Sequence, residues 1–429
     1  MRPPSDAYAA GGASHRSRVI EGTPFFYGWV VLAAGTFGMM MTTPGQTLGV
    51  SVFLDKIIAD LGVSRSFVSL LYTVGTVTGS FVLPFVGRFI DRRGPRLAVV
   101  LIAALFALAC GYMGLVRNVA MLLVGFVLVR GLGQGSLSLV SQHVVNLWFV
   151  RRRGLAVGLT GLGMAAATAF FPMIIESLIA SYGWRQAYVL LGLLVGVTIL
   201  PVGAVLFRSR PESFGLVPDG GRPSAARRAP VREVDYTLSE ARRTRTFWLF
   251  VAGNTLVSAL TTGLVFHHFS IMAAGGLDRA VAAEVFVPFG AMTAASNLVA
   301  GALMDRVPPR YLLAAMLVAQ TAALALAAIV VPDLVFVYGA LLGATMGIKG
   351  GVQGAVFAYY FGRTNLGAVK GTASTIGVAG TAAGPLLFAL TEAATGTYVP
   401  VLLASAVASL VLAGVSAVLR PFRADGSVA

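Results

Sequence analysis

Two basic residues lie deep inside long apolar segments of this chain, where a charge is costly. Arg130 lies within residues 119–147 and Lys349 within residues 333–360. A charged side chain at the middle of a bilayer costs about 3 kcal/mol, so one that persists usually faces protein or water. No acidic residue lies at a comparable depth. The acids of the apolar segments lie near segment ends, and they are Asp55, Glu176, Glu284 and Glu392. Two deep cations without a deep acid predict a site that binds an anion.

Lys349 has two interpretations. Gly347, Gly350, Gly351 and Gly354 surround it in the sequence. A helix thinned in this way fits beside a cavity, which favours contact between the Lys349 ammonium and a ligand. Alternatively, the long stem of Lys349 snorkels, so that its charge reaches the membrane interface. Both interpretations stay open from the sequence.

Amide and imidazole side chains in the same segments are further candidates for the site. They are Gln46, Gln134, His143, Asn254, His267, His268 and Gln353. Each could instead form a hydrogen bond between helices. The adjacent His267 and His268 could also carry a proton, since imidazole titrates near neutrality. Pro44 and Gly45 beside Gln46 predict a helix break of the kind found where backbone lines a cavity.

The elements that must position these residues are membrane-spanning helices. Of the 429 residues, 57% are hydrophobic and 11% are charged, which is too apolar for a water-soluble globular protein. A span needs roughly 20 apolar residues. The candidate spans are 26–54, 66–90, 96–115, 119–147, 154–181 and 186–207 in the first half, and 246–274, 281–304, 310–330, 333–360, 366–391 and 398–419 in the second. We therefore expect an all-α integral membrane protein with twelve transmembrane helices in two pseudo-symmetric six-helix bundles.

The distribution of arginine predicts the orientation of the chain in the membrane. Arginines concentrate in alternate loops, in both tails and in residues 208–245. By the positive-inside rule, the tails 1–25 and 420–429 and the linker 208–245 should be cytoplasmic. The bundles then cover residues 26–207 and 246–419. The same bias explains the net charge of +15 without nucleic acid as a partner.

A short signature occurs once in each half. Residues 87–96 read GRFIDRRGPR and residues 301–310 read GALMDRVPPR, so that Asp91 corresponds to Asp305. The first copy closely resembles the loop signature of the major facilitator superfamily, and it follows the second span as in that family. The segments FYGWVV, GVSRSFVS, WFVRRRGLAVG and GLVFHHFSIMAAGG resemble the bacterial monocarboxylate and oxalate/formate porter branch of that superfamily. An internal repeat of this kind is typical of transporters.

The resemblance implies a cytoplasmic latch that forms while a central cavity opens outward and breaks when it opens inward. Its residues would be Gly87, Asp91, Arg92 and Arg96 in the first copy, and Asp305, Arg306 and Arg310 in the second. The alternative is a topology anchor that holds each loop inside. Pro95 is expected to end the preceding helix.

The resemblance also implies that spans one, four, seven and ten line the cavity, which would bring Arg130 and Lys349 to the substrate. Arg130 lies in VRGLGQG, which resembles a fourth-span motif whose arginine often bonds neighbouring helices instead. Animal monocarboxylate transporters resemble this branch but carry an aspartate and an arginine where this sequence has Thr293 and Asn297. Their carboxylate-binding arginine and proton-coupling aspartate therefore cannot be carried over.

These observations predict a secondary active transporter that moves a small organic anion, a carboxylate, across the bacterial inner membrane by alternating access. We expect a monomer in the lipid bilayer, with protons as one candidate coupling ion. The alternatives are a proton-driven exporter of drugs or other small molecules and a non-transporting sensor of the same fold. A GxxxGP motif typical of the fifth span of exporters occurs here at residues 380–385, in the eleventh. No enzyme activity, cofactor or metal is expected, because the sequence contains no phosphate loop, nucleotide-binding cassette or metal-ligand cluster.

Overall fold

The computed structural model describes residues 17–149, 153–220, 236–304, 306–361 and 366–419, and all regular structure within them is helical. The first half contains α1 (Arg18–Glu21), α2 (Gly28–Met40), η1 (Thr43–Gly45), α3 (Thr47–Leu61), α4 (Arg65–Ser80), α5 (Leu83–Arg93), α6 (Pro95–Met113), α7 (Val119–Val129), η2 (Arg130–Leu137), α8 (Ser138–Trp148) and α9 (Arg153–Leu206). The expected all-α membrane fold is confirmed.

The described parts of the connecting region and the second half are also helical. They contain η3 (Pro211–Phe214), η4 (Pro218–Gly220), α10 (Leu238–Ala241), α11 (Arg245–Ala274), α12 (Arg279–Glu284), α13 (Phe286–Leu303), α14 (Pro309–Ile329), η5 (Pro332–Leu334), α15 (Val335–Phe361), α16 (Leu366–Thr395) and α17 (Val399–Val418). The predicted linker thus carries three short helical turns. Residues 221–235 of the linker and most of both predicted tails lie outside the described residues.

Nine segments of the described chain are long and apolar enough to cross a membrane. One of them, Gly158–Leu206, has 49 residues and contains a backbone break at Gly183, with φ 79° and ψ 162°. This break separates the two spans expected at 154–181 and 186–207. The first predicted span is divided into α2 and α3, each too short to count alone. Helix α16, which lies at the eleventh predicted span, is also not among the nine. With α16, the divided first span and the two spans joined in Gly158–Leu206, the nine segments are compatible with the predicted twelve helices.

The break predicted at Pro44 and Gly45 is confirmed. Helix α2 ends at Met40, η1 covers Thr43–Gly45, and Gln46 is extended before α3 begins. A Cβ at Gly45 would lie 2.2 Å from the carbonyl oxygen of Val129, so glycine allows η1 to contact the backbone of span four directly.

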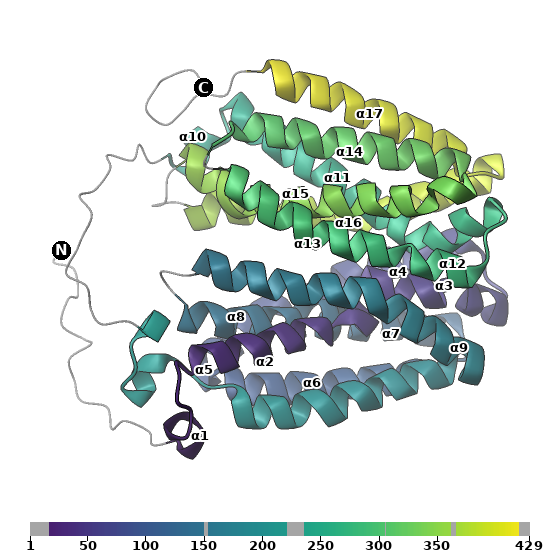
Figure 1. Cartoon of the computed structure of the whole chain (residues 1–429). Coiled ribbons are helices and arrows are strands. Elements are labelled where there is room, and N and C mark those ends of the chain that lie inside the picture. Colours follow the sequence, from purple (N-terminus) through teal and green to yellow (C-terminus); the bar gives the residue numbers. More distant parts are fainter. Residues whose placement is uncertain (1–16, 150–152, 221–235, 305, 362–365, 420–429) are drawn as a thin grey trace.

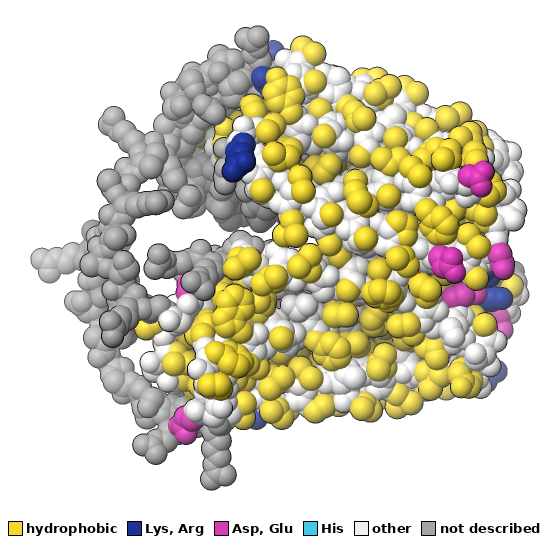
Figure 2. All heavy atoms as spheres, viewed as in Figure 1, with side chains coloured by type: hydrophobic (Ala, Val, Ile, Leu, Met, Phe, Trp, Pro, Cys, Tyr) yellow, Lys and Arg dark blue, Asp and Glu magenta, His cyan; other side chains and the backbone are white. Residues whose placement is uncertain are grey.

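The two halves form adjacent groups of helices whose long axes run in roughly the same direction (Figure 1). We call the two ends of the molecule the α10 end and the α12 end, after the helices that lie there. Helix α4 joins α16 through Thr73 Oγ1, which donates to the carbonyl of Ala382 at 2.8 Å. Between the halves, Figure 2 shows a hollow that opens toward the α10 end, whereas the surface is closed at the α12 end.

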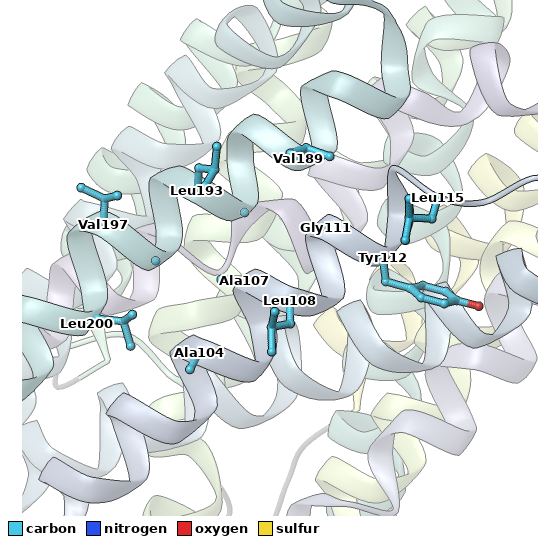
Figure 3. Close-up of a pocket in the computed structure, with 12 residues that line it drawn as sticks. Ala104, Ala107, Leu108, Gly111, Tyr112, Leu115, Val189, Leu193, Val197 and Leu200 are labelled. Carbon is cyan, nitrogen blue, oxygen red and sulfur yellow. The ribbon is translucent and has the colours of Figure 1, made fainter.

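An apolar groove of about 760 Å³ lies on the flank of the first half, between α6 and the last part of α9 (Figure 3). Leu108 and Val197 at this groove are 70% and 74% exposed. Exposed aliphatic side chains on a membrane-spanning helix are those that face lipid. Despite its size, the groove is therefore part of the lipid-facing surface.

Candidate functional site

A cavity of about 300 Å³ lies between the two halves and receives residues from both. Its polar lining residues are Gln46, Thr47, Gln134 and Thr168 from the first half, and Ser258, Thr261, Thr262, Lys349 and Thr381 from the second. Its apolar lining residues are Leu48, Met164, Val265, Phe289 and Met346. A concave pocket with a few convergent polar groups is the usual form of a small-molecule site.

Lys349 is the one ionisable residue among the described residues that line this cavity. None of the hydrogen bonds and ion pairs between described residues includes its ammonium group. Burying an ammonium without a partner is costly, so the geometry favours a ligand that supplies the missing negative charge. Lys349 faces the cavity, which differs from the snorkelling interpretation.

The glycines near Lys349 have a different role from the one expected. A Cβ at Gly347 would lie 2.4 Å from the carbonyl oxygen of Thr293, and one at Gly350 would lie 2.3 Å from Nδ2 of Asn297. These glycines therefore bring α15 close to α13. Thr293 and Asn297 lie in that helix contact.

Arg130 does not line the cavity but lies directly behind its wall. Its Nη1 donates to the carbonyl of Gly45 at 2.9 Å, and its Nε donates to Thr76 Oγ1 at 3.0 Å. Its guanidinium carbon is 4.7 Å from the centre of the Tyr72 ring. The Tyr72 hydroxyl is hydrogen-bonded at 2.7 Å to Thr47, which lines the cavity. Arg130 thus binds neighbouring helices, and one residue separates it from the cavity.

A π-helical turn, η2, positions the residues of span four. It begins at Arg130 and contains Gln134, which lines the cavity. Ser136 Oγ donates to the carbonyl of Gly131 at 2.7 Å, five residues earlier. A Cβ at Gly131 would lie 3.0 Å from the carbonyl oxygen of Gly79 on α4. Single π turns are frequent at functional sites, and this one was not predicted from the sequence.

The remaining polar candidates lie outside the cavity lining. His267 Nε2 is 2.8 Å from the carbonyl oxygen of Pro385, and His268 Nε2 is 2.8 Å from that of Ala282. Both imidazoles are fully buried. Asn254 is also buried and donates to the Phe250 carbonyl within α11. His143 and Gln353 are not among the lining residues either.

The signature residues lie toward the α10 end. Helix α5 ends at Arg93 and α6 begins at Pro95, so the predicted break at Pro95 is confirmed. The side chains of Arg92, Arg96 and Arg306 are exposed.

Two other members of the signature differ in their surroundings. A Cβ at Gly87 would meet no described atom within 4 Å, so no other described helix packs closely against this residue in this structure. Arg310 is buried and donates to the hydroxyl of Tyr311 at 3.1 Å. Asp305 and the side chain of Asp91 lie outside the described part of the chain, so the latch stays a prediction.

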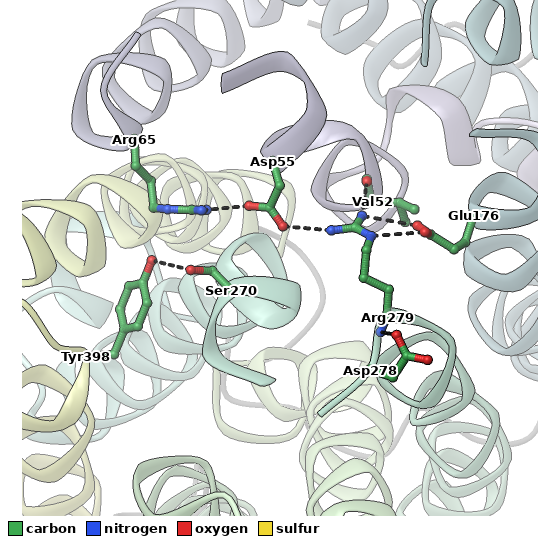
Figure 4. A network of polar contacts seen from close by, with 8 residues as sticks. All are labelled: Val52, Asp55, Arg65, Glu176, Ser270, Asp278, Arg279 and Tyr398. Carbon is green, nitrogen blue, oxygen red and sulfur yellow. Dashed lines mark hydrogen bonds and ion pairs between the residues drawn. The ribbon is translucent and has the colours of Figure 1, made fainter. Parts of the chain in front are cut away.

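A group of ion pairs that sequence reasoning missed lies at the α12 end (Figure 4). We call it the ionic cluster, and it consists of Asp55, Arg65, Glu176 and Arg279. In the sequence, Asp55, Arg65 and Arg279 belong to loops or span ends on one side of the predicted membrane, and Glu176 is near the same side. Their position on one side of the predicted membrane was the only sequence signal for the cluster. It does not predict which of these helix ends contact one another.

The comparisons with known proteins agree with the fold. The family model of the Major Facilitator Superfamily matches residues 29–278. The oxalate:formate antiporter of Oxalobacter formigenes is 27% identical over 221 residues, which cover 52% of this chain and 50% of that protein. Monocarboxylate transporter 11 of Homo sapiens is 26% identical over 71% of this chain and 64% of its own length. The matches thus span less than two thirds of either relative.

Two other similar proteins have names that refer to export or to a compartment and do not name a solute. The efflux pump FUS6 of Gibberella fujikuroi is 27% identical over 45% of this chain and 34% of its own length. A solved structure of a bacterial homologue of the human lysosomal transporter Spinster, inward-facing and occupied, covers 92% of this chain and 96% of its own, with a TM-score of 0.69 and 17% identity. That likeness concerns the fold. The family model covers more than half of the sequence, and the chain therefore belongs to the Major Facilitator Superfamily.

Proposed function

We propose that this protein is a secondary transporter that moves a small organic anion across the bacterial cytoplasmic membrane by alternating access. The observation that carries the proposal is the ammonium of Lys349, which has no partner among the described residues, in a cavity between the two halves whose described lining residues include no acid. In a medium of low dielectric constant, attraction between opposite charges is many times stronger than in water. The cavity therefore favours an anion over a cation or a neutral solute.

Arg130 adds to the positive potential of the cavity. Its contacts are with a carbonyl, a hydroxyl and an aromatic ring, and these neutral groups leave its charge uncompensated. A cavity of about 300 Å³ suits a small solute. The names of two relatives, an oxalate:formate antiporter and a monocarboxylate transporter, support a carboxylate.

The alternative of a proton-driven exporter was based on the GxxxGP motif at residues 380–385, and helix packing explains this motif. A Cβ at Gly380 would lie 2.5 Å from Thr255 Cγ2, and one at Gly384 would lie 2.1 Å from the carbonyl oxygen of Ala259. The glycines of this GxxxGP sequence thus let α16 pack closely against α11. This packing accounts for them without an antiport mechanism.

Uptake of radiolabelled mono- and dicarboxylates into proteoliposomes tests the proposal. We expect Lys349→Gln to reduce uptake at least tenfold, because the buried countercharge of the anion is lost. Lys349→Arg keeps the charge and should retain part of the activity. Lys56→Gln is the matched control, since Lys56 is exposed at the α12 end. This variant should transport normally. Normal uptake by Lys349→Gln, or uptake of cations instead of carboxylates, would contradict the proposal.

A further inference from the structure

The ionic cluster at the α12 end joins the two halves through a single residue. Arg279, on α12, is the member from the second half, and the other three come from α3, α4 and α9 of the first half. Arg279 Nη1 lies 2.8 Å from Asp55 Oδ2, and its Nε lies 2.9 Å from Glu176 Oε1. Its Nη2 also donates to the carbonyl of Val52 at 2.8 Å. All these contacts must break if the halves separate at this end.

Asp55 has a second partner that would stay with it. Arg65 Nη2 lies 2.6 Å from Asp55 Oδ1, and both residues belong to the first half. The charges therefore alternate from Arg65 through Asp55 and Arg279 to Glu176, as Figure 4 shows. When Arg279 withdraws, Arg65 still neutralises Asp55, and the ring of Phe269, 4.8 Å from the Arg279 guanidinium carbon, moves with Arg279 as part of the second half.

The geometry points to a gate with two opposing arginines, in which Arg279 holds the α12 end closed and Arg65 favours its opening. In the closed state Arg65 and Arg279 share Asp55 and repel each other across it. In the open state only Arg65 remains to pair with Asp55. The Arg65–Asp55 pair therefore stabilises the open state more than the closed state. The inference rests on the proposed alternating access, but not on the identity of the substrate.

The ion pairs are only partly exposed, so they contribute more to the free energy of the closed state than fully exposed pairs would. The side chains of the cluster are between 17% and 25% exposed, whereas fully exposed ion pairs contribute little. Breaking a shielded pair by removing one partner leaves the other charge uncompensated. A shift of about tenfold in the equilibrium between closed and open states is therefore expected for each arginine.

A cysteine reporter in the cavity measures this equilibrium without any substrate. The chain has one native cysteine, the buried Cys110, which is replaced by alanine, and Thr262→Cys is introduced in the cavity lining. A membrane-impermeant maleimide is applied from the side of the α12 end. Total reporter is measured after denaturation, so that each labelling rate is normalised to the amount of protein.

We expect Arg279→Gln to raise the labelling rate about tenfold and Arg65→Gln to lower it. Adding Glu176→Gln to Arg279→Gln should raise the rate no further, because Glu176 has then already lost its partner. The control is Arg185→Gln, which breaks a somewhat more exposed pair with Asp60 inside the first half. This variant should leave labelling unchanged.

Equal labelling of Arg279→Gln, Arg65→Gln and Arg185→Gln would overturn the gate, and so would an increase with both Arg279→Gln and Arg65→Gln. A reporter that never reacts from this side in any variant would overturn both the gate and alternating access. The expected labelling pattern in a protein that takes up no carboxylate would support the gate and contradict the proposed substrate alone.

Discussion

Arg130 is buried and Lys349 is half-buried, and the surroundings of the two cations give them different roles. Lys349 lines the cavity without a partner among the described residues, so its charge is available to a ligand. Arg130 is held by Gly45, Thr76 and the ring of Tyr72. Its planar group contacts three neighbours at once, which a lysine cannot reproduce.

We predict that Arg130→Met separates stability from transport. Burial of the guanidinium without an acidic partner is costly, and its hydrogen bonds offset that cost. The free energy of unfolding should therefore change by less than about 2 kcal/mol. Carboxylate uptake should nevertheless fall at least tenfold, because the positive potential behind Thr47 is lost.

Thermal unfolding in detergent and uptake by proteoliposomes check this prediction together. Arg130→Lys is the control that keeps the charge without the planar group, and its uptake should lie between those of the wild type and Arg130→Met. Uptake at the wild-type level in Arg130→Met would show that the charge of this residue does not act on the substrate.

The site was partly predictable from single residues. A lysine deep in an apolar segment is rare enough to indicate a site, and Lys349, Gln46 and Gln134 do line the cavity. Hydroxyl groups such as that of Thr262 could not be singled out, because serine and threonine are common in membrane helices. Which partner His267 binds depends on which helices are neighbours, and no local pattern contains that information.

At the scale of elements, the break in span one and the π turn in span four depend on each other. The carbonyl of Val129, directly before η2, lies where a side chain at Gly45 would have to fit. Gln46 and Thr47 enter the cavity from this break. The break was predictable from Pro44 and Gly45, since proline and glycine have local effects. The π turn was not, because it depends on packing against η1 and α4.

We predict that Gly45→Ala destabilises the protein by about 1–3 kcal/mol, because the added Cβ would overlap the Val129 carbonyl oxygen, 2.2 Å away. Gly111→Ala on α6 is the matched control. A Cβ at Gly111 meets no described atom within 4 Å, so alanine there should stabilise the helix slightly. Thermal unfolding of both variants in the same detergent measures the difference. A midpoint for Gly45→Ala at or above that of the wild type would contradict the proposed contact.

At the scale of the whole molecule, the halves meet toward the α12 end and separate toward the α10 end (Figure 2). Close backbone packing contributes to this contact in addition to the ionic cluster. A Cβ at Gly290 on α13 would lie 2.5 Å from the carbonyl oxygen of Ala165 and 2.8 Å from Cβ of Ala169, both on α9. This contact joins the two halves, so a larger residue at Gly290 must push them apart.

We therefore predict that Gly290→Leu shifts the molecule toward the state that is open at the α12 end. The leucine side chain cannot be accommodated while α9 and α13 are in contact. Labelling of a cavity cysteine from the α12 side should rise, and net uptake should fall, because the carrier no longer returns readily to the state with a closed α12 end. Gly414→Leu on α17 is the control, since a Cβ at Gly414 meets no described atom within 4 Å. This variant should leave both the labelling rate and the uptake rate unchanged. If Gly290→Leu lowered labelling from the α12 side, the contact between α9 and α13 would not hold that end closed, and the ionic cluster would have to do so alone.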